Sequence, residues 1–287
     1  MTSFSDNNYS SKDYSDFRPT YPSALFTTLI DYHKGPRNLA IDLGCGPGTA
    51  TYPLSRYFAK VIGSDPSTVM IEQASKAAAL KNQSNLQFVV SAAEDISSYI
   101  HSPGSVDLIF AAQSAHWFQH DKWFNECAMA LRPGGTLAYC GYKDHCYVGS
   151  KLVNDMMLEF SYSDQYLGPY WEPGRQLLRN QLRDVIPPSN VFTNVQRIEY
   201  NAGESDPSGQ LMAKTMTLDA SESYVRTYSS FHNWRKDHPD EIARRDGGPG
   251  DIVDRLFDRV KNVTGWTERT ILQVEWSSII VLARRLL

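Results

Sequence analysis

Short apolar runs alternate with helix-forming stretches through the first half of the chain. Residues 39–43 (Leu-Ala-Ile-Asp-Leu) form a run typical of a strand that is buried on both faces. Further runs of this kind follow at 60–65, 86–91, 106–111 and 136–142. Between these runs, strong helix formers predict helices over 49–58, 70–80 and 121–131. Strands that alternate with helices predict right-handed crossovers and a parallel sheet.

The second half of the chain has a different pattern. Residues 151–183 predict a helix, an aromatic loop and a second helix, and further helices are predicted over 220–234 and 251–260. Only residues 191–200 and 271–283 have the pattern of strands. The economical interpretation is one seven-stranded α/β sheet with helices on both faces, whose last two strands come late, and a helical cap formed by insertions.

A glycine-rich turn follows the first predicted strand. Residues 42–49 are Asp-Leu-Gly-Cys-Gly-Pro-Gly-Thr, and a backbone without Cβ atoms at Gly44, Gly46 and Gly48 can turn sharply and approach a ligand closely. The next helix begins here and offers free N–H donors at its N-terminus. Asp65 ends the second predicted strand, about twenty residues after the first glycine, where a carboxylate can accept both hydroxyls of a ribose.

The spacing of the glycines distinguishes between cofactors. A dinucleotide fingerprint has its third glycine three residues after the second, and that position is Thr49 in this chain. The third glycine is instead Gly48, two residues after Gly46. The spacing therefore argues against a cofactor that binds through a pyrophosphate at this turn. It is compatible with a cofactor that has an amino-acid tail beside a ribose.

Residues 42–49 resemble motif I of the class I S-adenosylmethionine-dependent methyltransferases, which have a Rossmann-like fold, and 131–135 resemble that family's turn into strand five. Residues 91–95 resemble its next motif, in which a side chain matching Asp95 or Glu94 approaches the adenine. The resemblance implies S-adenosylmethionine as the cofactor. The cofactor-binding residues it implies are Asp42, Gly44, Gly46, Gly48, Asp65, Met70, Glu94, Asp95 and Gln113.

Four segments elsewhere resemble the fungal trans-aconitate 3-methyltransferase subfamily. They are residues 18–22, 115–118, 167–172 and 224–229. This resemblance implies O-methylation of a small carboxylic acid. It also implies three parts of the chain: an arm that covers the site (1–37), a cofactor-binding core (38–148), and cap insertions with the last two strands (149–287). Tyr9, Tyr14 and Tyr21 of the arm would close over the cofactor.

The chemistry of a carboxylate acceptor indicates which residues should bind it. A carboxylate has a reference pKa near 4, so it is already ionised and needs a desolvated site and a cation rather than a base. Arg18, Arg175, Arg179 and Arg226 are candidate cations among aromatic residues, and Arg226 is the first choice. We predict His116 and Arg226 as catalytic residues. The predicted acceptor-binding residues are Trp117, Tyr170, Trp171, Arg175 and Tyr224.

Two other readings of the function remain open. The acceptor could be a hydroxyl or thiol of a fungal secondary metabolite, with His116 as the base that a phenol of pKa near 10 would require. Alternatively, the protein could bind S-adenosylmethionine without transferring its methyl group. Each arginine could also be an ordinary surface or structural residue, and His116 a structural histidine. The spacing of His116 and His120 suits a metal, but no cluster of carboxylates completes such a site, so we predict none.

The composition of the chain argues against several classes of binding partner. The 287 residues carry a formal net charge of −4 without a basic stripe, which argues against a nucleic-acid partner. No run approaches ~20 apolar residues, and residues 1–16 lack the apolar region of a signal peptide, so we expect no membrane association and a cytoplasmic location. The four cysteines show no CxxC spacing and predict reduced thiols. We expect a monomer that acts on a small molecule.

Overall fold

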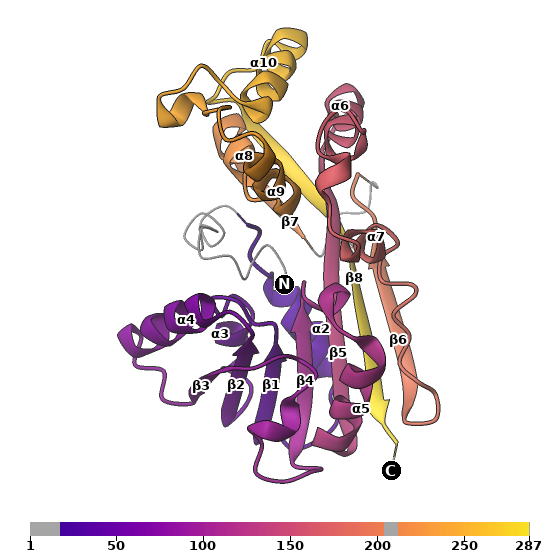
Figure 1. Cartoon of the computed structure of the whole chain (residues 1–287). Coiled ribbons are helices and arrows are strands. Elements are labelled where there is room, and N and C mark those ends of the chain that lie inside the picture. The colour runs from indigo at the N-terminus through magenta and orange to yellow at the C-terminus, as the bar shows by residue number, and fades with distance from the viewer. Residues whose placement is uncertain (1–17, 204–211, 287) are drawn as a thin grey trace. The chain divides into compact units, whose positions relative to one another are not determined.

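The computed structural model describes residues 18–203 and 212–286, which form two compact units (Figure 1). The larger, here the core unit, consists of Thr20–Lys143, Gln176–Tyr200 and Ser278–Leu287. The other, here the helical unit, consists of the described residues of Met1–Pro19, Asp144–Arg175 and Asn201–Ser277. No helix in these described ranges is long and apolar enough to cross a membrane.

The core unit is built on a sheet with the strand order β3-β2-β1-β4-β5-β8-β6. Strands β1 to β5 pair in parallel, and β6 pairs antiparallel with β8. The order reverses beside β1, so the loops after β1 and β4 diverge at the carboxyl edge of the sheet, where α/β proteins bind ligands. The strands are β1 (Leu39–Leu43), β2 (Lys60–Asp65), β3 (Leu86–Val90), β4 (Val106–Ala112), β5 (Leu131–Tyr147), β6 (Phe192–Tyr200) and β8 (Ile271–Arg285).

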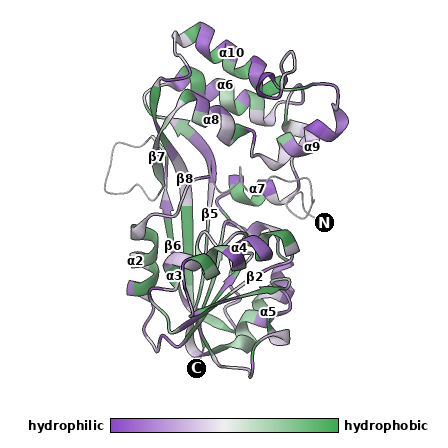
Figure 2. Cartoon of the chain, turned by 90° about the vertical axis from the view of Figure 1, so that its left-hand side faces the viewer, coloured by the Kyte–Doolittle hydropathy of each residue, from purple (hydrophilic) through white to green (hydrophobic). Residues whose placement is uncertain are grey.

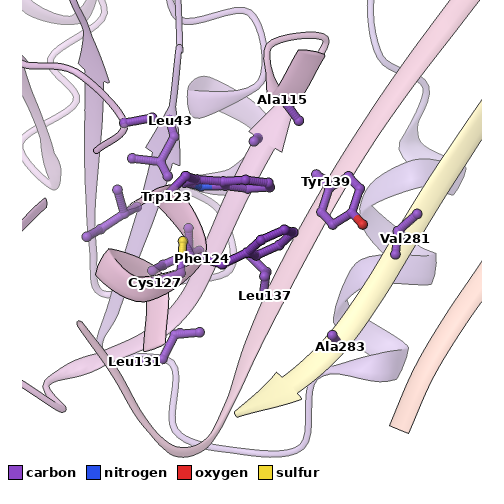
Figure 3. Packing of buried hydrophobic residues seen from close by; sticks show 14 of the residues in the cluster. Leu43, Ala115, Trp123, Phe124, Cys127, Leu131, Leu137, Tyr139, Val281 and Ala283 are labelled. Atoms are coloured by element: carbon purple, nitrogen blue, oxygen red, sulfur yellow. The ribbon is translucent and has the colours of Figure 1, made fainter. Parts of the chain in front are cut away.

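Aromatic side chains fill the core on one side of this sheet (Figure 3). The Trp123 ring stacks on Phe124 at a centroid distance of 4.6 Å and meets the edge of Tyr139 at 5.4 Å. Val281 and Ala283 of β8 belong to the same buried cluster. The helices of the core unit are α2 (Ser23–Tyr32), α3 (Thr51–Leu54), α4 (Thr68–Leu80) and α5 (His120–Ala130), with 3-10 turns η2 (Ile96–Ser98) and η3 (Ala115–Trp117).

Short helices and the strand β7 make up the helical unit. In α10, apolar residues at i, i+1, i+4, i+5 and i+8 are buried, and Figure 2 shows hydrophilic and hydrophobic positions side by side along it. A capping box formed by Asp251 and Asp254 starts this helix. The elements are α6 (Lys151–Tyr162), η4 (Gly168–Tyr170), β7 (Ala213–Thr217), α8 (Leu218–Val225), α9 (Ser229–Asp237), η6 (Arg244–Asp246) and α10 (Ile252–Thr264). The short helix α7 (Gly174–Arg179) spans the boundary between the units.

The predicted α/β fold is confirmed, with three local differences. The sheet has eight strands rather than seven, because β7 pairs with β8 although only Met216 of its five residues is buried. The predicted helix over 220–234 is two helices, since Tyr228 has an extended backbone and starts α9. The predicted helix over 49–58 is the single turn α3, followed by further turns.

The two compact units alternate along the chain. Strands β5 and β8 each contribute residues to both of them. The predicted boundaries after residues 37 and 148 stay a prediction. Tyr9 and Tyr14 of the predicted arm lie outside the described residues.

Candidate active site

The glycine turn after β1 contains one position that is open to a ligand. Gly44, Gly46 and Gly48 all have positive φ angles, of 63°, 54° and 90°. A Cβ at Gly44 would lie 2.5 Å from Ser114 Cβ, and one at Gly48 would lie 2.7 Å from the Tyr52 ring. A Cβ at Gly46 would have no atom of the described residues within 4 Å. Gly44 and Gly48 are therefore required by the protein's own packing, whereas Gly46 borders no other described residue.

The carboxylate of Asp65 is fixed by two backbone amides. Its Oδ2 accepts a hydrogen bond from Gly46 N at 2.9 Å, and its Oδ1 accepts one from Ser67 N, also at 2.9 Å. Burial raises the pKa of Asp65, although these two donors act in the opposite direction. Each carboxylate oxygen keeps a second lone pair for a further donor. The end of β2 thus presents an oriented acceptor beside Gly46.

Asp42 is a buried carboxyl group at the end of β1 with one oxygen unused. Its Oδ2 accepts from Thr51 Oγ1 at 2.6 Å. Its Oδ1 is buried and has no hydrogen-bond partner in the part of the chain that the structure describes. Burial raises the pKa of Asp42 to about 7. A buried oxygen without a donor is uncommon in folded proteins and is suited to a ligand that brings one.

The loop after β4 is tied to both neighbouring strands. Gln113 adopts a left-handed backbone, with φ 55°, and its side-chain amide pairs with Tyr142: Oε1 accepts from Tyr142 N at 2.7 Å and Nε2 donates to Tyr142 O at 3.0 Å. Ser114 Oγ donates to the carbonyl of Leu43 at 2.7 Å. The Gln113 amide therefore positions this loop, and its predicted cofactor contact stays a prediction.

His116 and Trp117 lie in η3, immediately after this loop. His116 is buried, and its ring centroid lies 4.5 Å from that of Trp117. His120 bonds through Nε2 to the carbonyl of Ala115 at 3.0 Å. The described residues hold no group of three or more His, Cys, Asp or Glu side chains that could bind a metal ion. A base or binding role for His116 stays a prediction.

Three predicted cofactor-binding residues line the segments after β2 and β3. Met70 is buried in the first turn of α4, which Ser67 caps. Glu94 Oε1 accepts from Gln119 N at 2.5 Å, so one of its oxygens is used within the protein. Asp95 is exposed at the start of η2. Of these two acids, Asp95 has the carboxylate with fewer hydrogen bonds to the described residues.

The helical unit contains an arginine held between an acid and two aromatic rings. Arg175 donates from Nη2 to Asp144 Oδ1 at 2.6 Å and from Nε to the Tyr162 hydroxyl at 2.9 Å. Tyr162 in turn donates to Asp144 Oδ1 at 2.6 Å, and the guanidinium lies 4.4 Å from the Trp171 ring centroid. Burial alone would raise the pKa of Asp144, but Arg175 and Tyr162 outweigh this and lower it. We call Asp144, Tyr162, Trp171 and Arg175 the Arg175 cluster.

Other predicted acceptor-binding residues lie in the same unit. The Tyr224 hydroxyl accepts from Trp276 Nε1 at 2.9 Å. Arg18 donates from Nη2 to Thr227 O at 2.7 Å, with its guanidinium 5.5 Å from the Tyr224 ring. The carbonyl of Tyr170 accepts from the Asn233 side chain at 3.1 Å.

Arg226 lies among acidic side chains, and its predicted catalytic role stays a prediction. Its Nη1 lies 2.5 Å from Asp251 Oδ2, and its Nη2 lies 2.9 Å from Glu222 Oε1 and 3.0 Å from Asp254 Oδ1. Three carboxylates therefore share its guanidinium, which links α8 to the start of α10. The sequence pattern placed Arg226 among aromatic residues but gave no sign of these acids.

Comparison with known proteins identifies the family of this chain. A family model for a methyltransferase domain matches residues 40–135. A Dictyostelium discoideum protein named "Putative methyltransferase" is 37% identical over 279 residues, covering 96% of this chain and 93% of the relative. The chain belongs to the class I S-adenosylmethionine-dependent methyltransferases.

Further matches agree with this family. A "Probable S-adenosylmethionine-dependent methyltransferase" of Saccharomyces cerevisiae is 28% identical over 99% of this chain and 98% of its own length. The solved structure of a "Putative Type II Methyltransferase" from Anaeromyxobacter dehalogenans superposes with a TM-score of 0.69 at 27% identity, covering 93% of this chain and 98% of the other. A Haemonchus contortus phosphoethanolamine N-methyltransferase, solved with S-adenosylhomocysteine, has a TM-score of 0.53 at 16% identity over all of this chain and 61% of its own, which shows a shared fold.

The geometry of this methyltransferase fits S-adenosylmethionine, the cofactor of its family. Among the residues that the structure describes, none lies within 4 Å of a Cβ at Gly46, none donates to Asp42 Oδ1, and each oxygen of Asp65 accepts one hydrogen bond. An amino-acid tail with an ammonium group and a ribose with two hydroxyls supply the donors that these oxygens lack. The sequence pattern had indicated all three residues.

Four residues of the helical unit that make hydrogen bonds in the Arg175 cluster or next to it were not predicted from the sequence. They are Asp144, His145, Tyr162 and Tyr228. A usable signal existed for two of them, because Asp144 and His145 closely follow the predicted strand 136–142. Polar residues directly after a buried parallel strand are frequent ligand contacts. Tyr162 and Tyr228 were indistinguishable from the many other aromatic residues.

The raised pKa of Asp42 predicts a measurable effect of pH on stability. An aspartate in the unfolded chain has a pKa near 3.9, so between that value and about 7 the folded state binds a proton that the unfolded state has lost. The free energy of unfolding contributed by this group therefore falls as pH rises through that window. The change amounts to about 1.4 kcal/mol per pH unit, or about 2 kcal/mol between pH 5 and pH 6.5.

Asp42→Asn removes this titration and keeps a side-chain oxygen for Thr51. Urea unfolding of both proteins at pH 5 and pH 6.5 should show the wild type losing about 2 kcal/mol relative to the variant. Parallel pH dependence in the two proteins would mean that Asp42 ionises normally in the folded state.

Proposed function

We propose that this methyltransferase O-methylates a carboxylate of a small acid, in the manner of the trans-aconitate methyltransferases that it resembles. The observation that carries this proposal is the Arg175 cluster. Its guanidinium is oriented by Asp144 and Tyr162, lies against Trp171, and has no bond at Nη1 within the described residues. An oriented arginine beside an aromatic wall is suited to bind a planar anion.

The cofactor would bind at the glycine turn of the core unit. Asp42 would accept from the ammonium of the amino-acid tail, Asp65 would accept from the ribose hydroxyls, and Gly46 would allow close approach of the backbone. Asp95 or Glu94 would meet the adenine, with Met70 and the backbone of Gly44 and Gly48 completing the site. When bound, S-adenosylmethionine supplies a methyl group on a sulfonium centre that is open to displacement.

Methylation of a carboxylate requires little acid–base catalysis from the protein's side chains. Because it is ionised at neutral pH, it needs no proton removed, and the enzyme has only to orient and desolvate it. Arg175 would hold the acceptor by its charge, while Tyr170, Trp171 and Tyr224 of the same unit would supply apolar walls with polar edges. The predicted roles of His116 and Trp117, which lie in the core unit, stay predictions.

Replacement of Asp65 with alanine should weaken cofactor binding by about 1–3 kcal/mol, which is roughly 5- to 150-fold in Kd. The variant loses both the ribose acceptor and the group that orients Gly46 N. Titration calorimetry with S-adenosylhomocysteine measures the change, and Glu72→Ala, an exposed acid on α4, is the matched control. Equal affinity of Asp65→Ala and wild type would remove Asp65 from the cofactor site.

The acceptor class can be tested with methyl-labelled S-adenosylmethionine and a matched panel of small di- and tricarboxylates, phenols and thiols. We expect label in a methyl ester that dilute base removes, with trans-aconitate or a related acid as the acceptor. Transfer only to a phenol or thiol would overturn the carboxylate assignment. In that case His116→Gln should abolish most activity and higher pH should restore it, as loss of a general base requires.

Binding of the cofactor without transfer to any compound of the panel would contradict the proposed activity. It would favour a protein that binds S-adenosylmethionine without using it as a methyl donor. Calorimetry on the same preparation separates this outcome from an inactive, misfolded sample.

A further inference from the structure

A buried imidazole in the helical unit has one nitrogen without a partner. His145 lies on β5 and is 6% exposed. Its Nδ1 lies 3.0 Å from the Tyr228 hydroxyl. Its Nε2 is buried and makes no hydrogen bond within the described residues. Buried polar atoms are nearly always satisfied, so this nitrogen requires an explanation.

The hydrogen bond to Tyr228 determines which nitrogen of His145 carries the proton. Burial lowers the pKa of His145 to about 4, so the imidazole is neutral near pH 7 and has one N–H. Nδ1 of His145 is the hydrogen-bond partner of the buried Tyr228 hydroxyl. If the hydroxyl donates to Nδ1, both groups are satisfied there and the imidazole proton lies on Nε2. The opposite tautomer would leave the Tyr228 O–H without an acceptor at this contact. Nε2 is therefore assigned as an N–H donor.

Two aromatic rings pack against His145, and their hydroxyls have other partners. The ring centroids of Tyr147 and Tyr224 lie 5.0 Å and 5.3 Å from the imidazole, nearly perpendicular to it. The hydroxyl of Tyr147 is bonded to Ser221 at 2.5 Å, and that of Tyr224 accepts from Trp276. These hydroxyls are thus engaged in other bonds.

His145 is joined to the Arg175 cluster by ring contacts. Tyr228, which orients the imidazole, lies 5.5 Å from Trp171, and Trp171 lies under the Arg175 guanidinium. Asp144, which anchors Arg175, is the residue before His145. A chain of contacts through Tyr228 and Trp171 therefore connects a neutral N–H donor with an oriented cation in the same unit. A neutral donor attracts an anion weakly alone, but beside an arginine it adds a directional bond to an oxygen of that anion.

We propose that His145 donates a hydrogen bond from Nε2 to a carboxylate oxygen of the acceptor other than the one that is methylated, beside Arg175. The enzyme then selects di- and tricarboxylates over monocarboxylates, because the second carboxylate anchors the molecule while the first receives the methyl group. This inference rests on the proposed function, since it assigns the acceptor a second acid group. His145 is an acceptor-binding residue in this account and takes no proton from the substrate.

The first test compares a matched pair of acceptors, a diacid and the monocarboxylate in which a methyl group replaces the anchoring carboxyl group. His145→Phe keeps a ring of similar size and removes the donor. We expect it to lower kcat/KM for the diacid by about tenfold or more, chiefly through KM, and to leave kcat/KM for the monocarboxylate unchanged. The Kd for S-adenosylhomocysteine should not change. An equal loss on both acceptors would assign His145 a structural role and overturn the proposal.

The second test needs no turnover. Proton–nitrogen NMR of protein with 15N-labelled histidine, in the presence of S-adenosylhomocysteine, follows the His145 ring signals that are absent from His145→Phe. Addition of trans-aconitate should shift the Nε2 resonance, and the monocarboxylate with a methyl group in place of the anchoring carboxyl should not. No shift at a saturating concentration of the acid would overturn the proposal. A shift without methyl transfer to any acid would retain the carboxylate site and reject the proposed activity.

Discussion

Arg226→Met should lower the free energy of unfolding by about 3–5 kcal/mol, because removal of one partner leaves buried charges without compensation. The Arg226 side chain is 9% exposed, and those of Asp251 and Asp254 are 2% and 7% exposed. Without the guanidinium these acids would face each other in a site with little water. Methionine keeps much of the side-chain volume, so the loss reports on charge rather than on a cavity.

A surface ion pair of the same unit provides the control for Arg226. Arg255 pairs with Glu241, and the two side chains are 54% and 34% exposed. Arg255→Met should change the free energy of unfolding by about 1 kcal/mol or less. Urea unfolding measures both variants. Wild-type stability of Arg226→Met together with a raised KM for the acceptor would instead support the predicted catalytic role of Arg226 as the cation that binds the carboxylate.

Gly46→Ala should reduce cofactor affinity on the order of 100-fold, while the fold itself loses about 1 kcal/mol. The added Cβ would meet no atom of residues 18–203 or 212–286 within 4 Å, so the cost to folding is the strain of a φ angle of 54°. The loss in binding arises because the methyl group occupies the space that borders the cofactor site. Calorimetry with S-adenosylhomocysteine and thermal unfolding give the two quantities separately.

Gly44→Ala is the matched variant two residues earlier in the same turn. Its Cβ would lie 2.5 Å from Ser114 Cβ, so the variant should be destabilised by more than Gly46→Ala before any ligand is added. The contrast between the two glycines is the informative result. Wild-type affinity in Gly46→Ala would show that the cofactor does not approach this position.

The parts of the fold that local sequence determines were predicted well. The strands β1 and β4 are buried on both faces, and such strands are continuous apolar runs in the sequence. The glycine turn was evident because its backbone needs positive φ angles, which glycine adopts most readily. Asp65 followed from its position at the end of the next strand. Each of these signals lies within a few residues of the feature it predicts.

The contacts that the sequence did not reveal join distant residues. Arg226 meets Asp251, which is 25 residues away, and His145 meets Tyr228, which is 83 residues away. A cation near aromatic residues has the same local pattern whether its partner is a substrate or a buried acid. The strand β7 was missed for a similar reason, because its pairing with β8 and not its own composition makes it a strand.

Mass spectrometry of a single reaction tests the proposed O-methylation of a carboxylate most directly. The enzyme is incubated with S-adenosylmethionine that carries a trideuterated methyl group and with a dicarboxylate whose carboxyl oxygens are 18O. We expect one product, a trideuteromethyl ester that retains both 18O atoms in the esterified carboxyl group and reverts to the acid in dilute base. Recovery of the 18O-labelled acid without a trideuteromethyl group while the cofactor is bound, or a trideuteromethyl group found only on a phenol or thiol added to the same mixture, would contradict the proposed O-methylation.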